Sequence, residues 1–496
     1  MRVTFGEWLP DAPELANPGV TVARGVVPIS VGYAPMNAWA DGGHSAIDAR
    51  ARGSIAMVDD AGNPVNVVGN ATKLYKLDGT GLTDVSIAGG YHVTDEARWE
   101  FVRWRNNIIA VNPNDDSQYF DLQTSTAFAV LATDVPRARH AGVVRNFVVL
   151  GNVYTVTDGL LTDTVAWCAN NNPFSWPIPG SDLAISVLSG QQALAGGGGW
   201  VQSVVNDGAE VGGIFQEHSI WRMDFEGGDT VWRFTRVEPA KGLLIPGLAI
   251  PRGRQVLYCD EDGFYLWDYT ASKPVGEERI NRTFLADLDS AYLDRVSWAQ
   301  DPDSPNAFIL YPGSGNTGGT PNKALVYNWV LNRFSELEFT AGLELMTRYV
   351  APGVHLDTTP DDDVDGAGFA SFDQRQSAYG AATLAAWDGS EKLGTFSGSG
   401  VAATLETGDV QLDPQRRARV SHVRPLVKGA EATVQIAALS KSTSTVNYSA
   451  VSRQNPDGKC PVRSDGRYHR IRVNIPSGGF TDATGVDLQA TLTGTR

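Results

Sequence analysis

The sequence predicts an all-β protein: a β-propeller of six or seven blades, with six favoured, an extended N-terminal arm and a small C-terminal β-sandwich-type domain. Three observations lead to this prediction. They are a strand-and-turn pattern that returns about every fifty residues, a proline-rich beginning, and a change to apolar–polar alternation after residue 400. Gly and Pro supply 53 and 26 of the 496 residues. This excess over the average favours a turn-rich β protein over a helix bundle.

The repeat runs from residue 41 to residue 400, and each unit has an aromatic strand that ends in a polar turn. A four-stranded blade cannot bury both of its faces alone, so such units stack on one another around a ring. The first and last units can share one blade, which leaves both blade counts open. A pair of β-sandwiches is the alternative, because sandwich strands recur as well. The central residues of the units are Tyr75, Phe120, Trp167, Trp221, Trp267, Tyr327 and Trp387, at spacings of 45, 47, 54, 46, 60 and 60 residues.

Two of these spacings carry insertions. The one near 281–296 has apolar residues at helical intervals, among them Phe284, Leu288 and Tyr292, and predicts an amphipathic helix. The other, near 357–368, is an acidic loop. Four strand-like runs between the aromatic positions fit the inner strands of blades. They are residues 107–111, 146–150, 255–258 and 307–311.

The acidic loop holds the only candidate metal ligands. Asp361, Asp363 and Asp365 have the alternate spacing with which a calcium loop begins, where carboxylates converge on one hard cation. The twelfth position, which supplies a bidentate Glu in such loops, is Phe372. A solvated acidic loop is therefore the main interpretation, and a weak cation site at the three aspartates is the alternative.

The first 40 residues are predicted to form an extended arm, since they include five prolines, and proline favours extended geometry. Trp8, Val20 and Val26 make this arm too apolar for a free tail. It is expected to lie either on its own domain or on a neighbouring subunit.

Residues 401–496 are predicted to form a small antiparallel β domain of sandwich type. In residues 468–475, His469, Ile471, Val473 and Ile475 face one way and polar residues face the other. Similar runs at 420–427, 433–439 and 486–492 are bounded by turn-forming residues.

Charge and cysteine content limit the function. The formal net charge of −16 argues against a protein that holds nucleic acid by neutralising phosphates. Of the 40 basic residues only nine are Lys, and Arg is the better interface residue because its planar fork makes bidentate pairs. Three distant cysteines give neither a disulfide framework nor a zinc site and favour a reducing place of synthesis. No secretory leader and no membrane-spanning segment are expected.

No motif predicts catalysis or a cofactor. The string from Gly313 to Gly318 matches GxGxxG, but a strand follows it where a dinucleotide site needs a helix, so a hairpin loop is expected. The seven His residues show neither HxH nor HExxH spacing. We therefore expect no enzyme activity, no cofactor and no catalytic residues.

Several segments resemble tail nozzle proteins of short-tailed bacteriophages, also called tail tubular or packaged-DNA stabilisation proteins. The match is diffuse, covers most of the chain and depends on the order of its motifs. They are residues 8–11 (WLPD), 17–19 (NPG), 26–28 (VVP), 32–35 (GYAP), 70–77 (NATKLYKL), 104–110, 326–328 with 334–335, 467–472 (RYHRIR) and 485–487 (GVD).

The resemblance implies a structural virion protein at the distal end of the tail, made in the bacterial host cytoplasm. Its propeller protomers, usually six-bladed, would form a homohexameric C6 ring that retains packaged DNA and passes it at ejection. The ring would bind the portal-tail adaptor and tail fibres or spikes, and double-stranded DNA would pass its lumen without sequence-specific contacts. An acidic lumen would repel DNA and let it slide, so we expect carboxylates to exceed Lys and Arg there. The alternatives are a carbohydrate-binding adhesin and a polysaccharide-degrading propeller enzyme, which needs two carboxylates about 5 to 10 Å apart in an aromatic cleft.

Overall fold

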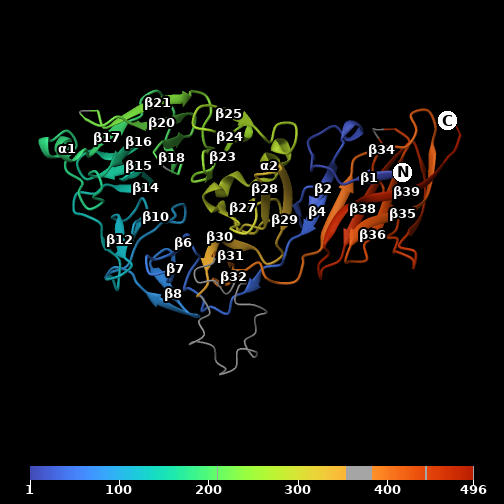
Figure 1. Ribbon diagram of the computed structural model, residues 1–496, viewed down its shortest axis with the longest axis horizontal. Helices are drawn as coiled ribbons and strands as arrows, with labels where there is room; N and C mark the ends of the chain where they lie inside the picture. The colour runs from blue at the N-terminus through green and yellow to red at the C-terminus, as the bar shows by residue number, and fades with distance from the viewer. Residues whose placement is uncertain (209, 229, 353–381, 442–443, 495–496) are drawn as a thin grey trace, which may run out of the picture.

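The computed structural model describes residues 1–208, 210–228, 230–352, 382–441 and 444–494 (Figure 1). Seven antiparallel four-stranded units follow one another in these residues, and each is one blade of a propeller. The predicted fold class is confirmed. The blade number is seven, the second of the two counts that the sequence allowed, and not the six that were favoured.

The blades take their strands in chain order, apart from the last strand of blade 7. Blade 1 has β6 (Gly53–Val58), β7 (Pro64–Gly69), β8 (Leu74–Asp78) and β9 (Gly81–Asp84); blade 2 has β10 (Glu100–Trp104), β11 (Asn107–Val111), β12 (Gln118–Asp121) and β13 (Ala129–Val130). Blade 3 has β14 (Arg137–Val144), β15 (Phe147–Thr155), β16 (Gly159–Trp167) and β17 (Gly190–Ala193); blade 4 has β18 (Val201–Asn206), β19 (Gly212–Gln216), β20 (Ile220–Phe225) and β21 (Trp232–Glu238). Blade 5 has β22 (Ala249–Arg252), β23 (Gln255–Asp260), β24 (Gly263–Trp267) and β25 (Ser272–Pro274); blade 6 has β26 (Ser297–Gln300), β27 (Asn306–Tyr311), β28 (Lys323–Asn328) and β29 (Arg333–Glu338). Blade 7 has β30 (Leu343–Val350), β31 (Ala382–Asp388), β32 (Leu393–Thr395) and, from the N-terminal arm, β5 (Ala40–Asp41).

The ring closes between the last blade and the first. The first strands of the blades lie nearest the axis, and β30 of blade 7 contacts β6 of blade 1. The outermost strand of blade 7 is β5, in which Ala40 pairs with Thr395 and Asp41 with Gly394. The closing strand thus comes from the start of the chain and has no aromatic centre. Seven aromatic units therefore give seven blades, and the last blade is completed by a strand from the N-terminal arm.

The aromatic positions occupy equivalent places in six blades. From Tyr75 to Tyr327 each lies on the third strand of its blade, whereas Trp387 lies on β31, the second strand of blade 7. The four runs predicted as inner strands all fall on second strands, such as β11 and β27. Five of the six residues of β27 are apolar and all six are buried, because blades pack against both faces of the strand.

The predicted helix near 281–296 is two shorter helices. The α-helix α2 (Asn281–Asp287) is followed by a 3-10 helix η2 (Ser290–Arg295). Asp289 breaks the pattern: its backbone N–H donates to Pro312 O at 3.0 Å, and its side chain accepts from Ala291 N at 3.1 Å. A residue that caps a new helix has an extended backbone, so it cannot also continue the helix before it. The GxGxxG string lies in the loop between β27 and β28, as expected for a hairpin.

The N-terminal arm lies along its own chain, which is the first of the two alternatives considered. It contains β1 (Arg2–Thr4), η1 (Glu14–Ala16), β2 (Val20–Arg24), β3 (Val26–Pro28), β4 (Tyr33–Pro35) and β5. β1 pairs with β39 of the C-terminal domain, and β2 lies between β29 of blade 6 and β33 of that domain. One nine-stranded sheet therefore continues from blade 6 through the arm into the C-terminal domain.

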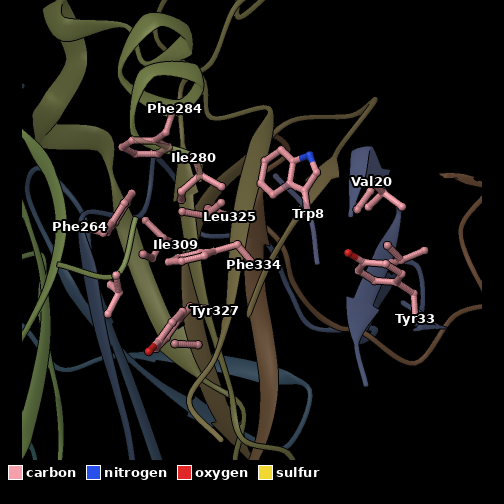
Figure 2. Close-up of a cluster of buried hydrophobic side chains, with 14 of the residues drawn as sticks. Trp8, Val20, Tyr33, Phe264, Ile280, Phe284, Ile309, Leu325, Tyr327 and Phe334 are labelled. Atoms are coloured by element: carbon pink, nitrogen blue, oxygen red, sulfur yellow. The ribbon is translucent and has the colours of Figure 1, made fainter. Parts of the chain in front are cut away.

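The junction has a continuous apolar core. Figure 2 shows Trp8 of the arm beside Phe334 and Ile280 of the propeller, with Val20 and Tyr33 on the side toward the C-terminal domain. The carboxylate of Glu7 forms an ion pair with Arg279 at the same boundary. The arm thus fixes the two domains to each other by burial as well as by strand pairing.

The C-terminal domain is the predicted two-sheet sandwich. Its strands are β33 (Ala403–Thr407), β34 (Val410–Gln411), β35 (Ala418–Lys428), β36 (Thr433–Leu439), β37 (Cys460–Gly466), β38 (Tyr468–Ile475) and β39 (Asp482–Leu492). The side chains of His469, Ile471, Val473 and Ile475 are buried, as the alternation predicted. Arg470 is buried as well, because it forms ion pairs with Asp409 at 2.8 Å and with Glu14 of the arm at 2.6 Å.

Candidate functional site

The axial channel of the propeller is narrow and crossed by side chains. A hollow of about 280 Å³ lies among the first strands of five blades, with Val102, Ala141, Val204 and Pro251 in its wall. The indole of Trp298 lines it and donates to Gly247 O at 2.8 Å. This hollow is the size of a small ligand pocket.

A charged cluster lies next to this hollow. Arg98 of blade 2 donates to Val296 O at 2.9 Å and also to Pro246 O, so that its guanidinium joins the segments that lead into blades 5 and 6. Glu100 accepts from Ala141 N at 3.1 Å and lies 3.0 Å from His140 Nδ1. Burial lowers the pKa of His140, and the nearby Glu100 carboxylate opposes this. These contacts tie blades 2, 3, 5 and 6 together across the axis.

A larger hollow lies on blade 3. Its volume is about 720 Å³, and its wall includes Asp134, Arg137, Tyr154 and Asp158 together with two tryptophans. The hairpin of β15 and β16, nine residues in each strand, forms one side of it. The other side is the segment that leads to the helix α1 (Asp182–Val187).

The two tryptophans of this hollow do not present the exposed ring faces that sugar stacking needs. The indole N–H groups of Trp167 and Trp176 donate to Leu188 O at 3.0 Å and Pro173 O at 2.7 Å. Both rings are buried, and Arg137 binds the carboxylate of Asp116 at 2.9 Å. The tryptophans therefore support the wall of the hollow from within.

Large apolar side chains are exposed around the same blade. Val156 at the tip of the β15–β16 hairpin is 94% exposed, Ile178 75%, Leu183 61% and Leu160 59%. Leu160 pairs with Tyr154 across the hairpin, and Ile178 accepts through its backbone from Ser181, the N-cap of α1. We call these residues, with Tyr154, the blade-3 apolar surface. Tyr154, Val156 and Ile178 line the same hollow, and exposed apolar residues gathered in this way mark sites of association.

The outer face of the sandwich sheet β35–β37–β39 is basic. A hollow of about 500 Å³ lies between β35 and β37, lined by Arg419, His422, Pro461, Val462 and Arg463. Residues 401–496 hold 13 Lys and Arg against eight Asp and Glu, a net charge of +5, whereas residues 1–400 hold 27 against 48, a net charge of −21. We call the exposed Arg419, Arg424 and Arg463, together with the half-buried Lys459, the sandwich basic face.

The Ser464–His469 and Ser314–Lys323 pairs have the composition of catalytic sites, but their geometry is structural. Ser464 Oγ lies 3.1 Å from His469 Nδ1, yet both side chains are buried between the sheets and His469 Nε2 bonds Ala418 O at 3.1 Å. Ser314 Oγ lies 3.3 Å from Lys323 Nζ, but the ammonium is bound by Asp287 at 2.8 Å and is not free to act as a base. Neither cluster is arranged for nucleophilic chemistry.

The metal candidates Asp361, Asp363 and Asp365 lie outside the described residues. Across the described residues, no group of three or more His, Cys, Asp and Glu side chains is placed to hold a metal ion. The three cysteines are free and buried, and burial raises the pKa of each thiol. In the described part of the chain, no helix has the length and apolar character needed to span a membrane. The blade-3 apolar surface and the sandwich basic face were missed by sequence reasoning, because exposure cannot be recognised along the chain.

No family model and no curated protein matches this chain. Among solved structures it is similar to BBS1N in its complex with ARL6DN, at 9% identity over 72% of this chain and 96% of that one, with a TM-score of 0.40. It is also similar to BamB from Moraxella catarrhalis, at 12% identity over 66% and 90%, with a TM-score of 0.35. The WD40 domain of Neurospora crassa Pan2 matches at 5% identity over 60% and 82%, also with a TM-score of 0.35. TM-scores this low carry no argument about the fold. The propeller is established from the order of the strands in the sheets alone.

Proposed function

We propose that this protein is a structural virion protein that forms the distal ring, or nozzle, of a short phage tail. The observation that carries the proposal is the blade-3 apolar surface, which lies at the end of the propeller away from the sandwich (Figure 1). A protein that works alone rarely exposes so many large apolar side chains together, whereas a subunit of a ring covers them with its neighbour. The resemblance of the sequence motifs to tail nozzle proteins supports the same function.

The proposed conduit is the lumen of a homohexamer and not the axis of one propeller. The axial hollow within a chain is only about 280 Å³ and is bridged by Arg98 and Trp298. A DNA duplex would therefore pass between six copies. The net charge of −21 over residues 1–400 supports an acidic lumen, which repels phosphates and lets the duplex slide. The adaptor and the fibres or spikes would bind outer surfaces of the ring.

We also propose that the protein has no enzymatic activity. The buried tryptophans of the blade-3 hollow and the buried Ser464–His469 contact support this. A mutational loss of glycan cleavage or glycan binding by the purified chain would favour the enzyme or adhesin alternatives.

The test is the mass and symmetry of the purified particle. Light scattering should give six times the chain mass of 53.2 kDa, and rotational averaging of electron micrographs should give sixfold symmetry. A chain that stays monomeric at every concentration would contradict the ring. A hexamer whose lumen has more Lys and Arg than Asp and Glu would keep the ring but overturn the repulsive conduit.

A further inference from the structure

The molecule has two unlike surfaces at opposite ends. The blade-3 apolar surface lies beside α1, and the sandwich basic face lies beyond the junction at the other end (Figure 1). We propose that the blade-3 apolar surface of one copy docks on the sandwich basic face of a second copy. The inference rests on the proposed function, since it names the contact that holds the ring together.

The first surface projects as a hairpin tip. β15 and β16 form a hairpin whose tip is Val156, Thr157 and Asp158. The register shifts between Gly151 and Val153, an irregularity of the kind that increases strand twist. Turn tips are usually polar, so we expect another protein surface to cover Val156, which is 94% exposed at this tip.

Carboxylates surround this apolar tip. Asp134 and Asp158 line the hollow beside it, and Asp182 begins α1. All three are exposed, and within the described residues none of them forms an ion pair. The first surface is thus an apolar projection with unpaired negative charges around it.

The second surface is the complement of the first. The hollow of about 500 Å³ on the sandwich has Val462 and Pro461 in its wall and Arg419 and Arg463 beside them. It lies where the pairing of β35 with β37 shifts register between Val420 and His422. Within the described residues, Arg419, Arg463 and the nearby Lys459 form no ion pair.

The charges favour a contact between unlike surfaces. Two blade-3 surfaces facing each other would bring Asp134, Asp158 and Asp182 against their own copies, and two sandwich faces would bring cations together. Such like-charge contacts are disfavoured, whereas opposite charges around an apolar centre steer and orient association. A contact between two different surfaces is heterologous, as a ring requires.

The test uses two full-length variants, each with one surface disabled. Val156→Asp with Ile178→Asp disables the blade-3 surface, and Arg419→Glu with Arg463→Glu disables the sandwich face. We expect each double variant alone to lose the ring and remain monomeric in light scattering. An equimolar mixture should form a dimer and stop there, because each variant keeps one intact surface. The matched controls are Val330→Asp, an exposed valine on blade 6, and Arg416→Glu, in the loop before β35; both should form the wild-type particle.

The outcomes separate this interface from the proposed function. If the wild-type chain is hexameric and either double variant still forms the hexamer, the proposed interface is wrong. The proposed hexameric ring is then still supported. If only the blade-3 variant loses assembly, the blade-3 apolar surface docks on a surface other than the sandwich basic face, and the proposed interface is wrong. If the sandwich variant assembles normally but loses binding to double-stranded DNA, that face is a DNA surface. A wild-type chain that never assembles overturns the proposed function and the interface together.

Discussion

The propeller and the sandwich differ in how they are completed and in the charge they carry. The propeller is closed by the two-residue strand β5, while the sandwich takes the longer strands β1 and β2 from the same arm. The propeller side of the chain is acidic and the sandwich is basic. The comparison indicates that the arm is the structural element common to both domains, because it supplies strands to each. Four changes test this difference, from the largest expected effect to the smallest.

Arg470→Met should destabilise the sandwich by about 3–5 kcal/mol, because it leaves the buried carboxylate of Asp409 without its cation, whereas Glu406 keeps its pair with Arg472 at 2.8 Å. All 13 tryptophans lie before residue 401, so tryptophan fluorescence reports the propeller and the arm. Hydrogen exchange of β38 should become faster in the variant, while the fluorescence transition reports whether the propeller follows. The control is Arg417→Met, which removes a partly exposed pair with Asp465 and should cost less than about 1 kcal/mol. Equal effects of the two changes would contradict the structural role of Arg470.

Asp11→Ala should destabilise the junction by about 1–2 kcal/mol. The carboxylate of Asp11 accepts from Arg282 N at 2.7 Å and Thr283 N at 3.0 Å, so the arm caps the N-terminus of α2. Denaturant unfolding followed by tryptophan fluorescence measures the change. Both carboxylate oxygens of Asp11 accept, so Asp11→Asn keeps one of the two acceptors and should lose less stability than Asp11→Ala. An Asn variant more unstable than the Ala variant would show that capping is not the cause.

The stability of the sandwich should fall as the pH is lowered below about 6.5. Burial lowers the pKa of His469 from its ordinary value, so below that pH the unfolded chain binds a proton that the folded chain resists. The contribution of His469 to the free energy of unfolding is fully present above pH 6.5. As the pH falls below this value, the contribution is lost at no more than about 1.4 kcal/mol per pH unit. Hydrogen exchange of β38 at pH 7.5 and 5.5, corrected for intrinsic rates, measures it. His469→Gln should reduce the difference between the two pH values, and an unchanged difference would assign it to other groups.

Lys392→Met should leave the stability of the propeller unchanged within error. Its ammonium pairs with Asp41 at 2.9 Å where β5 closes blade 7, but both side chains are exposed to solvent. Thermal unfolding followed by tryptophan fluorescence is the measurement. A clear loss of stability would mean that this ion pair, and not the pairing of β5 with β32, holds the ring closed.

Much of the fold could be predicted because it depends on local patterns. The run 107–111 coincides with β11, and the alternation of residues 468–475 coincides with β38, since burial of one or both faces selects apolar residues at fixed intervals. The helix over 281–296 was predicted too long, because its interruption at Asp289 depends on a bond to Pro312 in another strand unit. Of the candidate sites, the metal ligands lie outside the described residues. The net charge of +5 over residues 401–496 can be read from the sequence, but the exposure of the blade-3 apolar surface cannot.

By itself the sequence determined the repeating strands, the alternating C-terminal domain and the apolar arm, because each follows from spacing along the chain. Only the tertiary structure decided that there are seven blades, that the arm binds its own chain, and that blade 3 and the sandwich lie at opposite ends of the molecule. These features depend on contacts between residues hundreds of positions apart, as between Asp41 and Gly394. Spacing along the chain cannot encode such contacts; they form only when the ring closes.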